Sequence, residues 1–252
     1  MSAKTIIAWT DRTFNAWWGC VKISPGCKNC YADALSRRYG HDVWGPGKPR
    51  RTFGEKHWSE PLKWDREAEK SGVPLRVFCG SMMDWAEDHP AADAIRPCLW
   101  DLVRATPHLD WQMLTKRAER IAGLLPAFWD EIKGHVWLGV SVENDNYAWR
   151  ADHLRVLEPA VRFVSYEPAL GPVPSLDLTG IDWLIYGGES GGGFRPEDKQ
   201  WARDVEKKCA ASGAAFFHKQ SAAYTTERGI ELDGRIVRNY PTPRRLPLPI
   251  AV

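Results

Sequence analysis

Short apolar segments recur along the chain from residue 73 onward, and each ends in a small or polar residue before a helix-like stretch begins. Their length and their content of β-branched and aromatic residues are typical of buried strands. A further short strand is expected near the amino end, at residues 5–9. The predicted strands of the regular part are 76–81, 111–115, 136–141, 162–167, 183–188 and 215–219.

Segments with helical periodicity lie between these strands, and one more follows a cysteine-containing stretch near the amino end. The alternation predicts an α/β protein in which parallel strands are covered by helices. We expect a complete or partial (β/α) barrel of about six to seven parallel strands, although a doubly wound open sheet would produce the same pattern. The predicted helices are 31–39, 91–105, 117–131, 146–157 and 198–212.

The chain is interpreted as one barrel domain, residues 1–240, because barrels of this length are commonly single domains. Residues 40–65 interrupt the pattern with an irregular insertion rich in Gly, Pro and basic groups, and residues 241–252 form a proline-rich arm. Long irregular segments in compact domains are usually lids or binding loops. The alternative is a solvated loop whose aromatic side chains pack onto the barrel.

Polar side chains follow almost every predicted strand. Because barrel active sites are built at the carboxyl ends of the strands, these residues predict a pocket there. Glu143, Glu167 and Lys116 are the candidate catalytic groups, although the two glutamates could instead simply pair with Lys116 or Lys219. The strand-end residues are Ser81, Asp84, Thr115, Lys116, Arg117, Ser141, Glu143, Asn144, Ser165, Glu167, Gly187, Gly188, Glu189, His218, Lys219 and Gln220.

Three cysteines, Cys20, Cys27 and Cys30, fall in one loop, residues 17–32, at the spacing C-x6-C-x2-C. Thiolates are ligands for zinc and for iron–sulfur clusters. A structural zinc site normally closes with four protein ligands, so a set of three leaves one corner of a [4Fe-4S] cluster open. Two alternatives remain: a zinc site completed by a distant residue, with His218 the first candidate, or three unrelated buried thiols.

The run WWGCVKISPGCKNCYA resembles the start of a family of phage and bacterial proteins of unknown function that carry a three-cysteine motif. Six later runs occur in the order of that family, so the resemblance covers about residues 9–220. These runs are CGSMMDWAED, QMLTKRAER, WLGVSVEN, RFVSYEP, LIYGGESG and FHKQ.

More distantly, three cysteines ahead of a barrel resemble the radical S-adenosylmethionine (SAM) enzymes. This resemblance implies a [4Fe-4S] cluster on the three cysteines, whose open iron chelates the methionine part of SAM before SAM is reductively cleaved. Two features depart from that superfamily. The first cysteine gap is six residues instead of the common three, and the Gly-Gly-Glu that usually follows the second strand occurs only at residues 187–189, near the sixth.

Five residues are assigned to SAM by this resemblance and by their chemistry. Glu189 is expected to hold the amino group of the methionine part, and Gly187 and Gly188 would let the backbone approach the ligand closely. Arg195 offers a planar guanidinium to a carboxylate or phosphate, and Ser141 ends a strand beside them. The alternative for Glu189 is a turn carboxylate that caps the next segment.

Composition adds one anomaly, 14 tryptophans in 252 residues, some of which are expected to form flat stacking surfaces. A net charge of +2 does not by itself indicate a nucleic-acid-binding protein. The insertion nevertheless interleaves cations with aromatic residues. Arg50, Arg51 and Trp44, together with Lys219, are therefore assigned to a nucleic acid or nucleotide substrate.

The opening residues MSAKTIIAWTDRT lack the apolar run of a signal peptide, and no stretch reaches the roughly 20 apolar residues of a membrane span. We therefore expect a cytoplasmic protein without membrane contact. In that compartment clustered cysteines indicate metal binding more often than disulfides.

Two functions are consistent with this sequence. The first is an iron–sulfur enzyme of radical SAM type, which would need an electron donor and would act on a nucleic acid base or nucleotide. The alternative is a nucleic-acid-binding or phage accessory protein that zinc or a cluster stabilises, without SAM chemistry.

Overall fold

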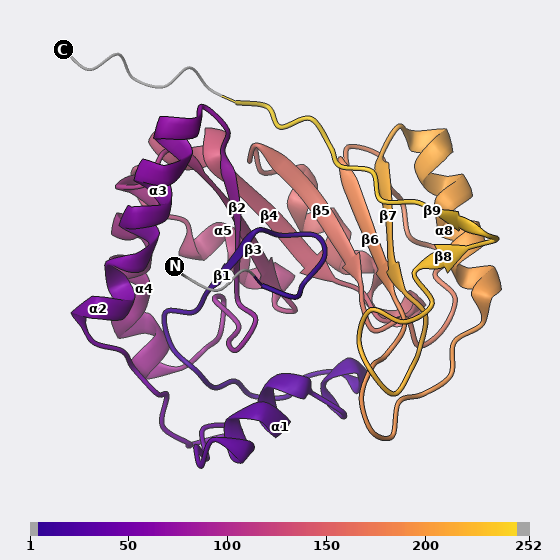
Figure 1. Ribbon diagram of the computed structural model, residues 1–252, viewed down its shortest axis with the longest axis horizontal. Coiled ribbons are helices and arrows are strands. Elements are labelled where there is room, and N and C mark those ends of the chain that lie inside the picture. The colour runs from indigo at the N-terminus through magenta and orange to yellow at the C-terminus, as the bar shows by residue number, and fades with distance from the viewer. Residues whose placement is uncertain (1–4, 246–252) are drawn as a thin grey trace.

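A seven-stranded parallel sheet forms the centre of the computed structural model, which describes residues 5–245 (Figure 1). The strands lie in chain order, and the two end strands are not paired with each other, so the sheet is a partial barrel. A doubly wound sheet is excluded because its strand order would reverse at a switch point. The strands are β1 (Arg12–Phe14), β2 (Leu75–Cys79), β3 (Leu109–Thr115), β4 (Val136–Ser141), β5 (Val161–Tyr166), β6 (Trp183–Gly187) and β7 (Ala215–Gln220).

The expected strand at residues 5–9 is wrong. The first strand is β1, which pairs in parallel with β2 through Arg12 and Val77. Trp9 instead packs its ring against Phe78, with ring centroids 4.5 Å apart, and is only 2% exposed. A short apolar segment that fills a barrel has the same sequence pattern as a buried strand, so periodicity could not separate the two.

Both faces of the sheet are apolar, as expected for parallel strands. Alternate residues of each strand form two separate clusters because side chains alternate between the faces. The cluster that includes helical residues such as Leu99 and Val205 lies on the helix-covered outer face. The other lies on the inner face with Trp9, and its aromatic members are Phe78, Trp137, Phe163, Trp183 and Phe217.

The helices confirm the predicted segments 31–39, 91–105 and 198–212. The expected helix at 117–131 is broken, because Pro126 favours an extended Leu125, which ends a short helix. The segment 146–157 begins as a 3-10 helix, Asp145–Ala151, and only Asp152–Arg155 is α-helical. The α-helices are α1 (Tyr31–Arg38), α2 (Glu55–Trp58), α3 (Glu60–Ser71), α4 (Pro90–Arg104), α5 (Ile121–Leu124), α6 (Trp129–Ile132), α7 (Asp152–Arg155) and α8 (Lys199–Ser212).

The insertion at residues 40–65 is less irregular than expected. It contains α2 and the start of α3, which has a proline in its first turn and ends at Gly72 in the left-handed conformation. An antiparallel hairpin of β8 (Glu231–Leu232) and β9 (Arg235–Ile236) was not predicted from the sequence. Its turn is an Asp-Gly pair with positive φ at both residues, which is a recognised hairpin signal.

The carboxyl-terminal arm, residues 241–252, is described only as far as residue 245, and the remainder lies outside the described residues. Arg244 pairs with Asp182, and Arg245 pairs with Asp110 at 2.5 Å. These contacts attach the arm to β3 and to the residue just before β6. Among residues 5–245, no helix combines the length and apolar character needed to cross a membrane.

Asp110 on β3 allows a test of this packing. Burial raises the pKa of its carboxyl group to about 6, although Arg245 acts in the opposite direction. Because the folded protein then holds this proton more tightly than the unfolded chain, the group lowers the free energy of unfolding as pH rises from about 4 to about 6. We expect Asp110→Asn to be more stable than the parent by roughly 2–3 kcal/mol at neutral pH.

The difference between the two proteins should vanish below about pH 3, where the parent carboxyl group is also neutral in both states. Urea unfolding of both proteins across this pH range measures it. If the free energies of unfolding of the two proteins changed with pH in the same way, Asp110 would not be a buried acid with a raised pKa.

Candidate active site

The cysteine loop, residues 17–32, lies against the ends of the strands, below the sheet in Figure 1. The backbone N–H of Trp18 donates to Arg51 at 2.9 Å, and that of Gly19 donates to Met82, just beyond β2, at 3.0 Å. Gly19 has φ +120°, and a Cβ atom there would lie 2.4 Å from the Val43 carbonyl oxygen. Only glycine therefore permits this close approach.

Cys20, Cys27 and Cys30 are free thiols of intermediate exposure. Burial raises the pKa of Cys20 and of Cys30. At Cys20 the guanidinium of Arg117 opposes this effect, with Nη1 3.7 Å from the sulfur. Metal binding would have to displace the thiol protons, because the thiolate is the ligand.

Within residues 5–245, no three His, Cys, Asp or Glu side chains are grouped so that they could hold one metal ion. A zinc ion would require its sulfur ligands to converge within about 2.3 Å of a single point. In an iron–sulfur cluster each thiolate binds a different iron, so the three sulfur atoms stand farther apart. Three thiol groups on one loop are the soft donor type that an iron–sulfur cluster takes from a protein.

Glu143, just beyond β4, fixes the middle of the cysteine loop. Its side chain is fully buried, and it accepts from Lys116 Nζ at 2.6 Å, from Arg150 Nη1 at 3.1 Å and from the Ser24 hydroxyl. A Cβ atom on Gly26 would lie 2.6 Å from Glu143 Cγ, so the loop packs directly on this carboxylate. Glu143 thus pairs with Lys116, which was the alternative to a catalytic role.

Asp84 and Arg117 hold the start of the loop. Arg117 donates to Asp84 at 2.6 Å and to the Val21 carbonyl oxygen at 3.0 Å, and both side chains of this ion pair are about 8% exposed. The Thr115 hydroxyl, at the end of β3, also donates to Asp84. The guanidinium of Arg117, which lies beside Cys20, is therefore held in a fixed position.

Glu189, just beyond β6, holds the far end of the loop. It accepts from Arg195 Nε at 2.9 Å and from Asn29 Nδ2 at 3.0 Å, and Arg195 also donates to the Pro25 carbonyl oxygen. Burial alone would raise the pKa of Glu189, but these hydrogen bonds outweigh it and lower the pKa. The two residues predicted to bind different parts of SAM are paired with each other.

Glu167 and Lys219 form a further ion pair at 2.5 Å, from the ends of β5 and β7. The Ser165 hydroxyl lies 3.5 Å from Glu167. Side chains along β4 and β5 alternate between the two faces of the sheet, and the inner face carries aromatic residues followed by Ser141, Ser165 and Glu167. The inner face therefore changes from aromatic to polar toward the carboxyl ends of the strands. A polar end of this kind suits a ligand with hydroxyl and carboxylate groups.

The structure explains both glycines of the Gly-Gly-Glu run without a ligand. A Cβ atom on Gly187 would lie 2.6 Å from Glu167 Cγ, and one on Gly188 would lie 2.1 Å from the backbone nitrogen of Ala222. Their small size is therefore required by the packing of the chain itself.

A comparison with models of protein families identifies the family to which this chain belongs. Residues 4–241 match the model of a family described as a protein of unknown function, DUF5131. The chain belongs to this family. The match confirms the predicted membership of a family of unknown function. No curated protein matches.

One solved structure similar to this DUF5131 protein is a mutant spore photoproduct lyase with bound AdoMet and dinucleoside spore photoproduct. The two chains are 13% identical with a TM-score of 0.48. The alignment covers 81% of this chain and 62% of that chain, so this chain spans less than two thirds of the lyase.

Two predicted nucleic-acid contacts of the DUF5131 protein are corrected by burial. The side chains of Arg50 and Glu87 form an ion pair and are both 0% exposed, so Arg50 faces the interior. Trp44 is 6% exposed and packs with Ala32 and Met82. Neither side chain is accessible to a nucleic acid. Arg51 is partly exposed, and Lys219 forms an ion pair with Glu167.

Four residues that position the loop were not predicted from the sequence. Asn29 and Ser24 each lie between two of the cysteines, so their places in the motif were usable signals. Glu87 and Arg150 carried none, because each reaches its partner only through the tertiary fold. Glu87 accepts from the backbone N–H of Val21 at 2.8 Å in addition to Arg50.

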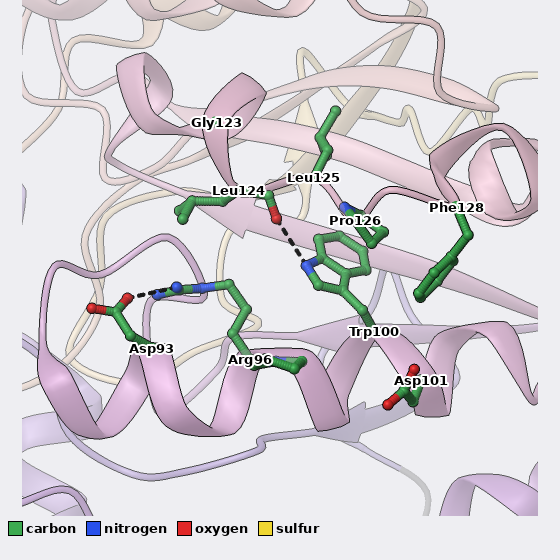
Figure 2. A pocket seen from close by; sticks show the side chains of 10 residues that line it. Asp93, Arg96, Trp100, Asp101, Gly123, Leu124, Leu125, Pro126 and Phe128 are labelled. Carbon is green, nitrogen blue, oxygen red and sulfur yellow. Dashed lines mark hydrogen bonds and ion pairs between the residues drawn. The ribbon is translucent and has the colours of Figure 1, made fainter.

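A separate pocket of about 300 Å³ lies between α4 and the segment 123–128 (Figure 2). Trp100 donates to the Leu124 carbonyl oxygen at 2.9 Å at its centre, and Arg96 pairs with Asp93 at 2.7 Å on one side. None of the residues that line it belongs to the cysteine loop or to the strand-end ion pairs. We therefore do not include it in the active site.

Proposed function

We propose that the protein is an iron–sulfur enzyme of radical SAM type. Cys20, Cys27 and Cys30 would hold a [4Fe-4S] cluster and leave one iron for SAM. The observation that carries this proposal is that three free thiols on one loop are fixed against the polar end of a partial barrel. When bound and reduced, the cluster supplies the electron that cleaves SAM and so starts radical chemistry on the substrate.

The residues around the loop have two roles in this proposal. Arg117 holds a positive charge beside the Cys20 sulfur, which favours the thiolate that binds iron. Glu189 and Glu143 hold the loop in place through Asn29 and Ser24. These contacts orient the cysteines before the cluster binds.

The inner-face groups next to the loop would receive SAM. Glu167 and Lys219 offer an acceptor and a donor from the ends of β5 and β7, and Lys116 offers a second ammonium group. Ser141 adds a hydroxyl group at the end of β4. Hydroxyl groups of a ribose and the charged ends of a methionine require this mixture of partners.

Anaerobic reconstitution with iron and sulfide tests the proposal. We expect about four iron and four sulfide per chain, a paramagnetic signal after reduction that changes when SAM is added, and 5'-deoxyadenosine as a product of SAM. A colourless protein that binds one zinc ion would overturn the proposal. That result would support the alternative, a metal-stabilised nucleic-acid-binding protein without SAM chemistry.

A further inference from the structure

Four aromatic rings from the cysteine loop, the end of α1, α2 and the segment that leads into it lie close together in a row. We call Tyr39, Trp18, Phe53 and His57 the aromatic row. Successive ring centroids are 6.2 Å apart for Tyr39 and Trp18, 5.9 Å for Trp18 and Phe53, and 4.2 Å for Phe53 and His57. His41 adds a ring 5.8 Å from Trp18. The row joins segments that are well separated in sequence.

The centre of the row is held rigidly. Trp18 and Arg51 form an antiparallel bridge with two backbone hydrogen bonds of 2.9 and 3.0 Å. The guanidinium of Arg51 lies 4.4 Å from the Trp18 ring centroid and 4.9 Å from that of Phe53. Because backbone hydrogen bonds hold Trp18 and Arg51 in place, a ligand would meet a preformed surface. Little binding free energy would then be spent on ordering these side chains.

The row is accessible and lies among cations. Tyr39 is 60% exposed, and Trp18, Phe53 and Arg51 are partly exposed. Arg51 forms no ion pair with a described residue, whereas its neighbour Arg50 pairs with Glu87. Exposed Arg38 and Lys56 lie next to the ends of the row in sequence. A hollow of about 410 Å³, lined by residues 54–57 and Glu60, adjoins His57.

We infer that the aromatic row binds single-stranded nucleic acid. His57 is stacked between Phe53 and Phe14, at 4.2 and 4.7 Å, and so closes one end of the row. Unpaired bases would stack on Tyr39 and Trp18, and the phosphates would meet Arg51, Arg38 and Lys56. A duplex is disfavoured because its base faces are already stacked on one another. The binding is independent of the proposed function. If that function holds, the location of Trp18, two residues before Cys20, brings the bound strand beside the active site.

Fluorescence anisotropy with a labelled oligonucleotide of about 12 nucleotides tests the inference. The full chain without added iron is used, so that binding is measured apart from cluster chemistry. We expect the single strand to bind at least tenfold more tightly than the duplex of the same sequence. Trp18→Ala and Tyr39→Ala should each weaken single-strand binding by roughly 5- to 100-fold, because each removes one stacking surface.

Arg51 is tested through salt dependence. Arg51→Ala should weaken binding and reduce the slope of log affinity against log salt by about 0.7, the contribution of one phosphate contact on a single strand. Arg51→Lys should keep the slope, because the charge remains, but should still bind more weakly, because a flat guanidinium is lost.

Trp149→Ala is the matched control. Trp149 is 43% exposed and stacks edge-on with His153, away from the aromatic row in sequence, so its loss should leave binding unchanged. Circular dichroism confirms that each variant is folded. Equal affinity for duplex and single strand would overturn the inference, as would unchanged affinity in folded Tyr39→Ala and Arg51→Ala. Either result would leave SAM cleavage untouched and so would not bear on the proposed function.

Discussion

Replacing Cys20, Cys27 or Cys30 by serine is expected to remove nearly all iron from the reconstituted protein. Each thiolate would bind a different iron, so the loss of one leaves the cluster with two protein ligands. A serine hydroxyl is a hard and weakly acidic ligand that does not substitute for a soft thiolate. Iron and sulfide per chain, together with the visible absorption of the cluster, measure the result.

Cys98→Ser is the matched control for these variants. Cys98 is an exposed free thiol on α4, outside the cysteine loop. It should bind iron as the parent does. A loop variant that keeps its full iron content would show that its cysteine is not a ligand, and loss of iron in Cys98→Ser would indicate non-specific binding to thiols.

Replacing Glu87 by alanine is expected to destabilise the protein by roughly 3–5 kcal/mol, because it leaves the Arg50 charge buried without a partner. Both side chains are 0% exposed, and two hydrogen bonds of 2.8 Å join them. Glu87 also accepts from the backbone N–H of Val21, directly after Cys20. We therefore expect reconstituted Glu87→Ala to hold less iron as well. Urea unfolding at neutral pH measures the stability.

The double variant Arg50→Met/Glu87→Leu should recover much of this loss, because a buried ion pair can be replaced by apolar groups of similar volume at little cost. The control is Arg203→Ala on α8, which breaks an ion pair with Asp233 whose side chains are 38% and 45% exposed. Its effect should stay within about 1 kcal/mol. Equal losses for Glu87→Ala and Arg203→Ala would contradict the argument from burial.

The cysteine loop shows how far local sequence could predict the site. The motif identified three candidate ligands and the adjoining helix, because spacing and residue type are local properties. Proximity of the strand-end residues followed from parallel topology. Whether Glu143 is free or paired depends on Lys116 and Arg150, which reach it only in the folded chain.

Arg50 and Arg51 show most clearly what could not be predicted from the local sequence. They are neighbours with the same chemistry, yet Arg50 is sealed in an ion pair and Arg51 lies over two exposed rings. Nothing in residues 40–65 separates them, because adjacent residues of an extended segment point to opposite sides. The partner that decides the matter, Glu87, belongs to a distant part of the chain.

The sequence by itself determined the α/β alternation, the parallel sheet and the grouping of the three cysteines, because hydrophobic periodicity and motif spacing are written locally. Only the tertiary structure decided that the barrel is partial and that Trp9 fills it. It also decided that Glu189 pairs with Arg195 and that the aromatic row is continuous. Each of these depends on which distant residues meet, and that is set by the packing of the whole chain.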